Sequence, residues 1–159
     1  MSAPVVVLTA AAHRAGKRVG DQLVDDGWDI AFWSLAVLRS RVVHAEAKGR
    51  RAVALRGNIA DPRSVAFLVA ETTERFPTVD AVVHLDADEL ALDETGTDPA
   101  TSALVELGAV KVVYVAATAF TADVALSWCA THEVDALVLD AADKIHNIAP
   151  AVAAFLARA

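Results

Sequence analysis

The sequence predicts a single α/β domain built on a parallel sheet that helices cover on both faces. The chain has 159 residues, which is about the size of one domain. Apolar residues make up 55% of it, with 35 Ala and 23 Val, so small and β-branched side chains fill the interior. Short runs rich in Val, Ile and Leu alternate with helical stretches, as in a sheet that is buried on both faces.

The elements follow from this alternation. Strands are predicted at 4–9, 28–33, 51–56, 79–85 and 134–140. Helices are predicted at 14–26, 36–48, 62–76, 101–131 and 148–158. Asp61 is placed to cap the third helix, and Pro62 fits its first turn. Gly27 and Gly49 follow the first two helices as C-terminal stops. The acidic connection 86–100 is either a solvated loop or the rim of a cleft at the carboxyl end of the sheet.

Charge and composition exclude several classes of protein. The chain carries 14 Lys and Arg against 21 Asp and Glu, a net charge of -7, and has no basic cluster, so we expect no nucleic-acid binding. No apolar run reaches the ~18 residues of a membrane span, and the N-terminus lacks a signal-peptide pattern. We therefore expect no membrane association and a cytoplasmic location. The single Cys129 forms no internal disulfide, and the histidines lack metal-ligand spacing, so no metal site is expected.

The strongest local signal is a strand, a short turn and a helix over residues 5–19. The turn reads Thr9-Ala10-Ala11-Ala12-His13-Arg14-Ala15-Gly16. A dinucleotide-binding turn needs glycine for the tight bend, for close approach to the diphosphate and for packing of the helix on the strand. Only the last of these glycines is present here.

This turn nevertheless resembles the T-G-x3-G-x-G motif that opens the short-chain dehydrogenase/reductase family. Thr9 matches the threonine and Gly16 the last glycine, while Ala10 and Arg14 replace the other two. The arginine is similar to the T-G-A-A-K-R-x-G variant of a branch that includes the pteridine reductases. The resemblance implies a shortened and degenerate member of this family.

The resemblance continues further along the chain. Residues 57–65 (GNIADPRSV) are similar to the family's G-D-V-x-D-P-x-S-V segment, with Asn58 where an Asp usually meets the adenine. Residues 71–83 resemble the helix and strand that lead to N-N-A-G, but His84-Leu85-Asp86-Ala87 stands in place of that motif. The strand at 135–140 takes the place of the strand that ends in the catalytic Ser.

The resemblance implies a Rossmann-like, three-layer α/β/α fold whose mainly parallel, five-stranded sheet has the order 3-2-1-4-5 and lacks the C-terminal part of the family fold. Family members oxidise alcohols or reduce carbonyls with a nicotinamide cofactor, using a Tyr in Y-x3-K, a Ser and an Asn. In this chain Tyr114 is the only tyrosine, and Thr118 stands where its Lys would be. The Ser falls at Ala141 or Ala142, and the Asn near Ala109.

We therefore expect a non-catalytic binding, regulatory or structural subunit. The alternative is an NADPH-dependent oxidoreductase, a reductase of carbonyl or pterin type, whose catalytic parts come from a partner chain or from other residues of this one.

Two cofactor states remain open, NADP(H) or none. The diphosphate of a dinucleotide would meet the helix that starts at Arg14. The second strand ends at Ser34 without the carboxylate of an NAD site, so Ser34 with Arg39 or Arg41 favours a 2'-phosphate. Against binding, Ala10 places a methyl group where the turn needs positive φ. The expected cofactor contacts are Thr9, Ala11, His13, Arg14, Gly16, Ser34, Asn58, Ile59 and His84.

The resemblance also implies a dimer formed by the helices at 101–131 and 148–158. Val110, Val113 and Phe120 recur at helical steps in the first, and the second is apolar almost all round. The expected partner is a second copy of the chain or a full-length relative.

Overall fold

The computed structural model describes residues 2–9, 11–12, 14–36, 38–59, 61–85, 107–108, 111–116, 130, 134–140 and 145–158. Its strands are β1 (Val5–Leu8), β2 (Asp29–Ser34), β3 (Ala52–Arg56), β4 (Ala81–Leu85), β5 (Lys111–Ala116) and β6 (Asp135–Asp140). Its helices are α1 (Arg14–Asp25), α2 (Arg39–Ala47), α3 (Pro62–Arg75) and α6 (Ile145–Leu156).

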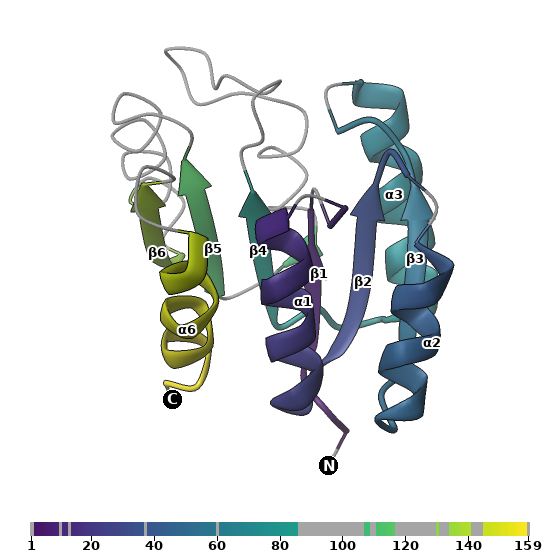
Figure 1. Ribbon diagram of the computed structural model, residues 1–159. Helices are drawn as coiled ribbons and strands as arrows, with labels where there is room; N and C mark the ends of the chain where they lie inside the picture. Colours follow the sequence, from purple (N-terminus) through teal and green to yellow (C-terminus); the bar gives the residue numbers. More distant parts are fainter. Residues whose placement is uncertain are drawn as a thin grey trace.

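The strands form one parallel sheet with the order β3-β2-β1-β4-β5-β6 (Figure 1). Helices α1, α2 and α6 cover one face of the sheet and α3 lies on the other, which gives the Rossmann-like α/β architecture that the sequence predicts. Because the chain turns from β3 back past β1 to β4, the topology reverses between β1 and β4. In folds of this kind, ligands bind outside the carboxyl ends of the strands at that reversal.

The predicted sheet had five strands, and the structure has six. Residues 111–116 were expected inside a helix at 101–131, but they form β5, which pairs with β4 on one side and β6 on the other. The predicted fifth strand is therefore β6. The sequence KVVYVA is rich in β-branched and aromatic residues, which favour strands, while its valines also fit a helical period. Burial between two neighbouring strands decides between the two.

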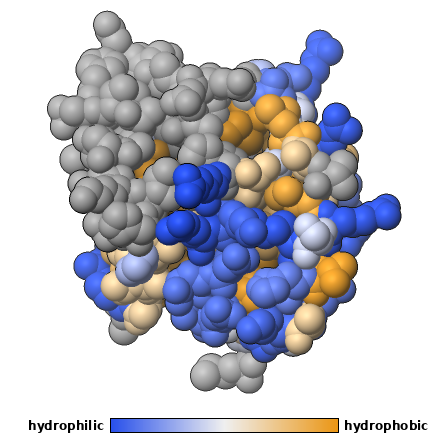
Figure 2. Space-filling model, viewed as in Figure 1, coloured by the Kyte–Doolittle hydropathy of each residue, from blue (hydrophilic) through white to orange (hydrophobic). Residues whose placement is uncertain are grey.

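Alternating side chains of the strands build two cores. Val6 and Leu8 of β1 pack with the helices α1 and α6, whereas Val5 and Val7 pack on the side of α3, where Leu68 is fully buried. The outer face of α1 and α2 is mostly hydrophilic (Figure 2). This pattern is that of a helix that buries one stripe and exposes the other.

The predicted helix ends are confirmed. The Asp61 side chain accepts a hydrogen bond from the Arg63 backbone N–H at 3.0 Å, and Pro62 occupies the first turn of α3. Gly27 and Gly49 have φ angles of 94° and 79°, a left-handed conformation in which other residues are strained.

The last helix starts three residues earlier than expected. Its apolar side chains Ile148, Val152, Phe155 and Leu156 are buried, and α6 packs against α1. The apolar surface that was expected to need a partner chain is thus covered within the chain. The prediction of a dimer remains a prediction, and most of residues 101–131 lie outside the described part of the chain.

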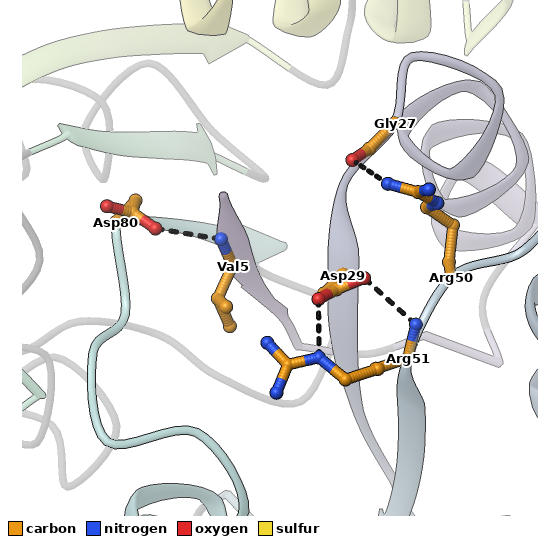
Figure 3. A network of polar contacts seen from close by, with 6 residues as sticks. All are labelled: Val5, Gly27, Asp29, Arg50, Arg51 and Asp80. Atoms are coloured by element: carbon orange, nitrogen blue, oxygen red, sulfur yellow. Dashed lines mark hydrogen bonds and ion pairs between the residues drawn. The ribbon is translucent and has the colours of Figure 1, made fainter. Parts of the chain in front are cut away.

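A polar network ties the strands together at the amino-terminal edge of the sheet (Figure 3). The Asp29 carboxylate accepts hydrogen bonds from the Arg51 backbone N–H at 2.9 Å and from Arg51 Nε at 2.7 Å. The Val5 N–H donates to Asp80 at 2.8 Å, and Arg50 donates to the carbonyl oxygen of Gly27.

Among the described residues, no helix is long and apolar enough to cross a membrane.

Candidate functional site

The structure places Thr9 and His84 in contact at the carboxyl edge of the sheet. Thr9 follows β1, His84 lies in β4, and Thr9 Oγ1 is 3.0 Å from His84 Nδ1. The Leu85 N–H donates to the same hydroxyl at 2.9 Å, and the Thr9 N–H donates to the Val83 carbonyl oxygen at 3.0 Å. Both side chains are fully buried. Thr9 therefore fixes the end of β1 to the end of β4, where the topology reverses.

The turn after Thr9 leads directly into α1. Ala11 is fully buried, and its N–H donates to the Trp33 carbonyl oxygen at 3.1 Å, so this N–H holds the turn against β2. Arg14 is the first residue of α1 and its side chain is exposed, whereas Gly16 is buried within the helix. His13, another predicted contact, lies outside the described residues.

The other predicted contacts lie at the ends of β2 and β3. Ser34 is the last residue of β2, is 6% exposed, and accepts a hydrogen bond from the Ala36 N–H at 3.0 Å through its Oγ. Asn58 follows β3 with an exposed side chain, and its backbone N–H donates to Ser64 Oγ. Ile59 is partly buried against the core on the side of α3. These three residues therefore lie at the ends of β2 and β3, which are the first and second strands beside β1, the strand that Thr9 follows.

Arg41 is not at this edge, contrary to the prediction that it serves a 2'-phosphate. Its guanidinium lies over the Phe32 ring, donates to the Lys17 carbonyl oxygen at 3.0 Å, and is 3.5 Å from the Asp21 carboxylate. Burial lowers the pKa of Arg41, and the charge of Asp21 opposes this shift. The arginine thus ties α2 to α1. Arg39 is exposed at the first position of α2.

The sequence did not single out Arg56, the last residue of β3. It pairs in register with Ser34, so its side chain belongs to the same end of the sheet. The signal was present in the sequence, because the predicted strand at 51–56 ends at this arginine and neighbouring parallel strands end at a common edge.

The structure corrects the placement of the family's catalytic positions. The strand beside β4 is β5, so the strand that ends in the catalytic Ser corresponds to Lys111–Ala116 rather than to 135–140. The positions Ala109, Thr118, Ala141 and Ala142 lie outside the described residues. Tyr114 is described, and it lies inside β5 with 2% exposure and its ring 4.9 Å from that of His84.

A cavity of about 440 Å³ lies at the amino-terminal edge, lined in part by Arg51, Phe76 and Asp80, and is therefore at the opposite end of the sheet from Thr9. No group of three or more His, Cys, Asp or Glu in the described part of the chain is placed to hold a metal ion.

Comparison with known proteins relates the chain to a family of oxidoreductases. No family model matches it. It is 33% identical over 81 residues to the L-rhamnose 1-dehydrogenase (NAD(P)+) of Sphingomonas sp., a match that covers 49% of this chain and 32% of the relative. It is also 32% identical over 85 residues to a short-chain dehydrogenase/reductase of Hericium erinaceus, covering 50% and 34% of the two chains. Each match thus spans about a third of the relative's length.

A solved structure shares the fold over nearly the whole chain. An alcohol dehydrogenase from the archaeon Thermococcus sibiricus, complexed with 5-hydroxy-NADP, superposes with a TM-score of 0.83 at 17% identity, covering 99% of this chain and 92% of that one. The fold, the tether from Thr9 at the topological reversal and the two sequence matches agree with one another. The chain is thus similar in sequence, over about half of its length, to two proteins of which one is named a short-chain dehydrogenase/reductase, and it shares the fold of an alcohol dehydrogenase.

Proposed function

We propose that the chain binds NADP(H) at the carboxyl edge of its sheet and acts as a non-catalytic binding, regulatory or structural subunit. The observation that carries the proposal is the position of Thr9, buried at the topological reversal between β1 and β4 and followed by the turn into α1. A dinucleotide in this fold places its diphosphate at the start of that helix, where the backbone N–H groups and the helix dipole favour an anion.

The charges at this edge support an anionic ligand. Arg14 is exposed at the first position of α1, and the first turn of the helix contains no acidic residue. A charged hydrogen bond from this guanidinium to a diphosphate is worth about 1.5–3 kcal/mol. The alcohol dehydrogenase that shares this fold is complexed with 5-hydroxy-NADP, which agrees with this choice of ligand class.

The surroundings of Tyr114 support the non-catalytic part of the proposal. By the family's chemistry, a tyrosine with a Lys four residues on exchanges a proton with the substrate. Tyr114 is the only tyrosine of the chain, the residue four positions on is Thr118 and not a Lys, and the Tyr114 side chain is buried within β5. The phenol is thus packed in the core, against the His84 ring.

A second function is an NADPH-dependent oxidoreductase, of carbonyl or pterin type, that is completed by a partner chain or by other residues. The observation in its favour is the identity of the relatives, one of which is named as a dehydrogenase that uses NAD(P)+. If this alternative holds, the purified chain or its complex with the partner turns over.

Two measurements test the proposal. Titration with NADPH and with NADH, followed by calorimetry and by the fluorescence of Trp28 and Trp33, is expected to show binding of NADPH. Trp33 immediately precedes Ser34, so its fluorescence reports on this edge. An assay of NADPH oxidation with aldehydes, ketones and pterins is expected to stay at background. Absence of binding would overturn the ligand, and turnover above about 0.1 per second would overturn the non-catalytic role.

A further inference from the structure

The cavity of about 440 Å³ at the amino-terminal edge of the sheet is not used by the function proposed above. Its walls come from the residues before β1, from Arg51, which precedes β3, and from the segment that joins α3 to β4. Small-molecule sites in proteins have volumes of about 300–1,000 Å³. The cavity is therefore large enough for a small ligand, and its charged side chains indicate which kind.

Arg51 holds a positive charge in place at the wall of this cavity. Its Nε donates to the buried Asp29 carboxylate at 2.7 Å, and its guanidinium carbon lies 5.2 Å from the centre of the Phe76 ring, which also lines the cavity. Within the described part of the chain, its two terminal nitrogens form no hydrogen bond, and Figure 3 shows them on the side of Val5. A guanidinium fixed in this way presents a fork that binds a carboxylate through two hydrogen bonds.

Asp80 places a negative charge at the same cavity. One of its carboxylate oxygens accepts the Val5 N–H at 2.8 Å, which fixes the side chain beside β1. The other oxygen forms no hydrogen bond with any described residue, and in Figure 3 it points away from Val5. A carboxylate oxygen in this state is an acceptor for an ammonium group.

The charges around the cavity disfavour a simple anion. Two carboxylates, those of Asp29 and Asp80, stand against the single guanidinium of Arg51, so a phosphate or a plain carboxylate meets a net repulsion. An ammonium group beside Asp80 offsets this repulsion, and a carboxylate on the same molecule is then bound by Arg51. The remaining walls include Phe76 and Pro77, which suit an aliphatic chain.

We propose that this cavity binds a small zwitterion, an amino acid, whose carboxylate pairs with Arg51 and whose ammonium group pairs with Asp80. The site is independent of the dinucleotide, because the two lie at opposite edges of the sheet. α-Amino acids and ω-amino acids carry the same two charges at different separations, so the test compares one of each.

The ligands in the test are leucine and ε-aminocaproate, each with two analogues that lack one charged group. The analogues are isocaproate and isoamylamine for leucine, and caproate and pentylamine for ε-aminocaproate. NMR titration of the parent is expected to shift the amide signals of Arg51 and Asp80 with at least one amino acid, while that of Ala11 at the opposite edge stays unchanged. Each analogue should bind at least about tenfold more weakly than its amino acid, because it loses a charged hydrogen bond.

Two variants assign the charges. Arg51→Ala removes the fork, and Asp80→Asn removes the negative charge while it keeps an oxygen for the Val5 N–H. Each should weaken the amino acid about tenfold to a hundredfold. In Asp80→Asn the amino acid should bind no better than its matched carboxylate, and in Arg51→Ala no better than its matched amine. Arg51→Lys keeps the charge without the fork, and should lie between Arg51→Ala and the parent.

Two further variants test the place of binding. Thr78 lines the cavity from an exposed position, so Thr78→Trp fills the space and should abolish binding of the amino acid. Arg50→Ala removes the neighbouring positive charge, whose side chain donates to Gly27 outside the cavity, and should leave the affinity unchanged. Circular dichroism and a thermal melt confirm that each variant is folded.

Binding of either amino acid to the parent, with selective losses in Arg51→Ala and Asp80→Asn, supports the proposal. The proposal is overturned if the folded parent binds neither amino acid up to about 10 mM, or if the shifted amides lie away from the cavity. Equal affinity for an amino acid and its single-charge analogues, or an unchanged affinity in Thr78→Trp, also overturns it. None of these outcomes depends on whether the chain binds NADPH.

Discussion

Thr9 Oγ1 lies 3.0 Å from Nδ1 of His84, a residue 75 positions further along the chain, and it accepts the Leu85 N–H at 2.9 Å. One hydroxyl therefore joins two strands at the point where the sheet reverses its topology. A hydroxyl donates one hydrogen bond and accepts two, so Thr9 serves the Leu85 N–H and the His84 ring at the same time.

Removal of this hydroxyl should destabilise the fold. Thr9→Val keeps the shape of the side chain but leaves the Leu85 N–H without the acceptor it has here, a loss of about 1–3 kcal/mol in the free energy of unfolding. Thr9→Ser retains the hydroxyl and should lose less. Urea unfolding followed by tryptophan fluorescence measures both. Equal stability of Thr9→Val and the parent would show that the tether contributes nothing.

A second buried hydrogen bond joins the sheet to α3. Trp33 Nε1 donates to Thr72 Oγ1 at 2.9 Å, and both side chains are fully buried. Thr72→Val leaves the indole N–H buried without this acceptor, so it should also lower the free energy of unfolding by about 1–3 kcal/mol. Thr72→Ser is the matched control. The indole fluorescence of the folded state should shift in Thr72→Val, and an unchanged melting curve would contradict the prediction.

The sequence predicted β1, β2, β3, β4 and β6 from their apolar runs. Val5, Val6 and Val7 form a continuous apolar run because both faces of β1 are covered, and Asp61 and Gly27 mark helix ends through their own chemistry. β5 was missed, because its valines fit a helix and a strand alike.

The site depends on contacts that the sequence does not display. Arg41 lies beside α1 because Gly20 has no side chain there, and a Cβ at Gly20 would be 2.7 Å from its Nη2. That space follows from how α2 packs on α1, and it removes Arg41 from the edge of the sheet. The pairing of Ser34 with Arg56 likewise follows from the register of β2 and β3. Residue types predicted the edge, and packing decides which arginine lies near it.

The ion pair of Asp29 and Arg51 lies at the amino-terminal edge of the sheet, and its two side chains should contribute unequally to the free energy of unfolding. Asp29 is 3% exposed and receives both the backbone N–H and the Nε of Arg51 (Figure 3). Asp29→Ala should lower the free energy of unfolding by about 1–2 kcal/mol, because the partly buried N–H of Arg51 and its Nε both lose their acceptor. Arg51→Ala keeps the bond from the backbone and should lose less, since exposed ion pairs contribute about 0–1 kcal/mol. Urea unfolding that ranks the two variants in the reverse order would contradict this.

The prediction of a dimer is best tested at an exposed position of α6, because the apolar side chains of this helix are buried in the core. Val113 and Phe155 are buried in the core, so an Asp at either position would unfold the chain before it reported on assembly. Ala154 is exposed on α6, and Ala154→Glu places a charge on that face without disturbing the core. Light scattering should give about twice 16.7 kDa for the parent, and a lower mass for Ala154→Glu. A parent monomer at micromolar concentration would contradict the prediction.

The last prediction concerns the affinity for NADPH, and distinguishes a contact made by the first residue of α1 from a general effect of positive charge on this helix. Arg14 and Arg18 are both exposed on this helix, and only Arg14 stands at its first position. If the diphosphate of NADPH meets the start of α1, Arg14→Ala should weaken binding about tenfold to a hundredfold, and it should weaken NADH by a similar factor because both carry the diphosphate. Arg18→Ala, about one turn further on, removes the same charge and should change either affinity by less than about threefold. Calorimetric titration of both variants measures the two ratios. Equal losses in the two variants would show a diffuse electrostatic effect, and an unchanged affinity in Arg14→Ala would remove this residue from the site.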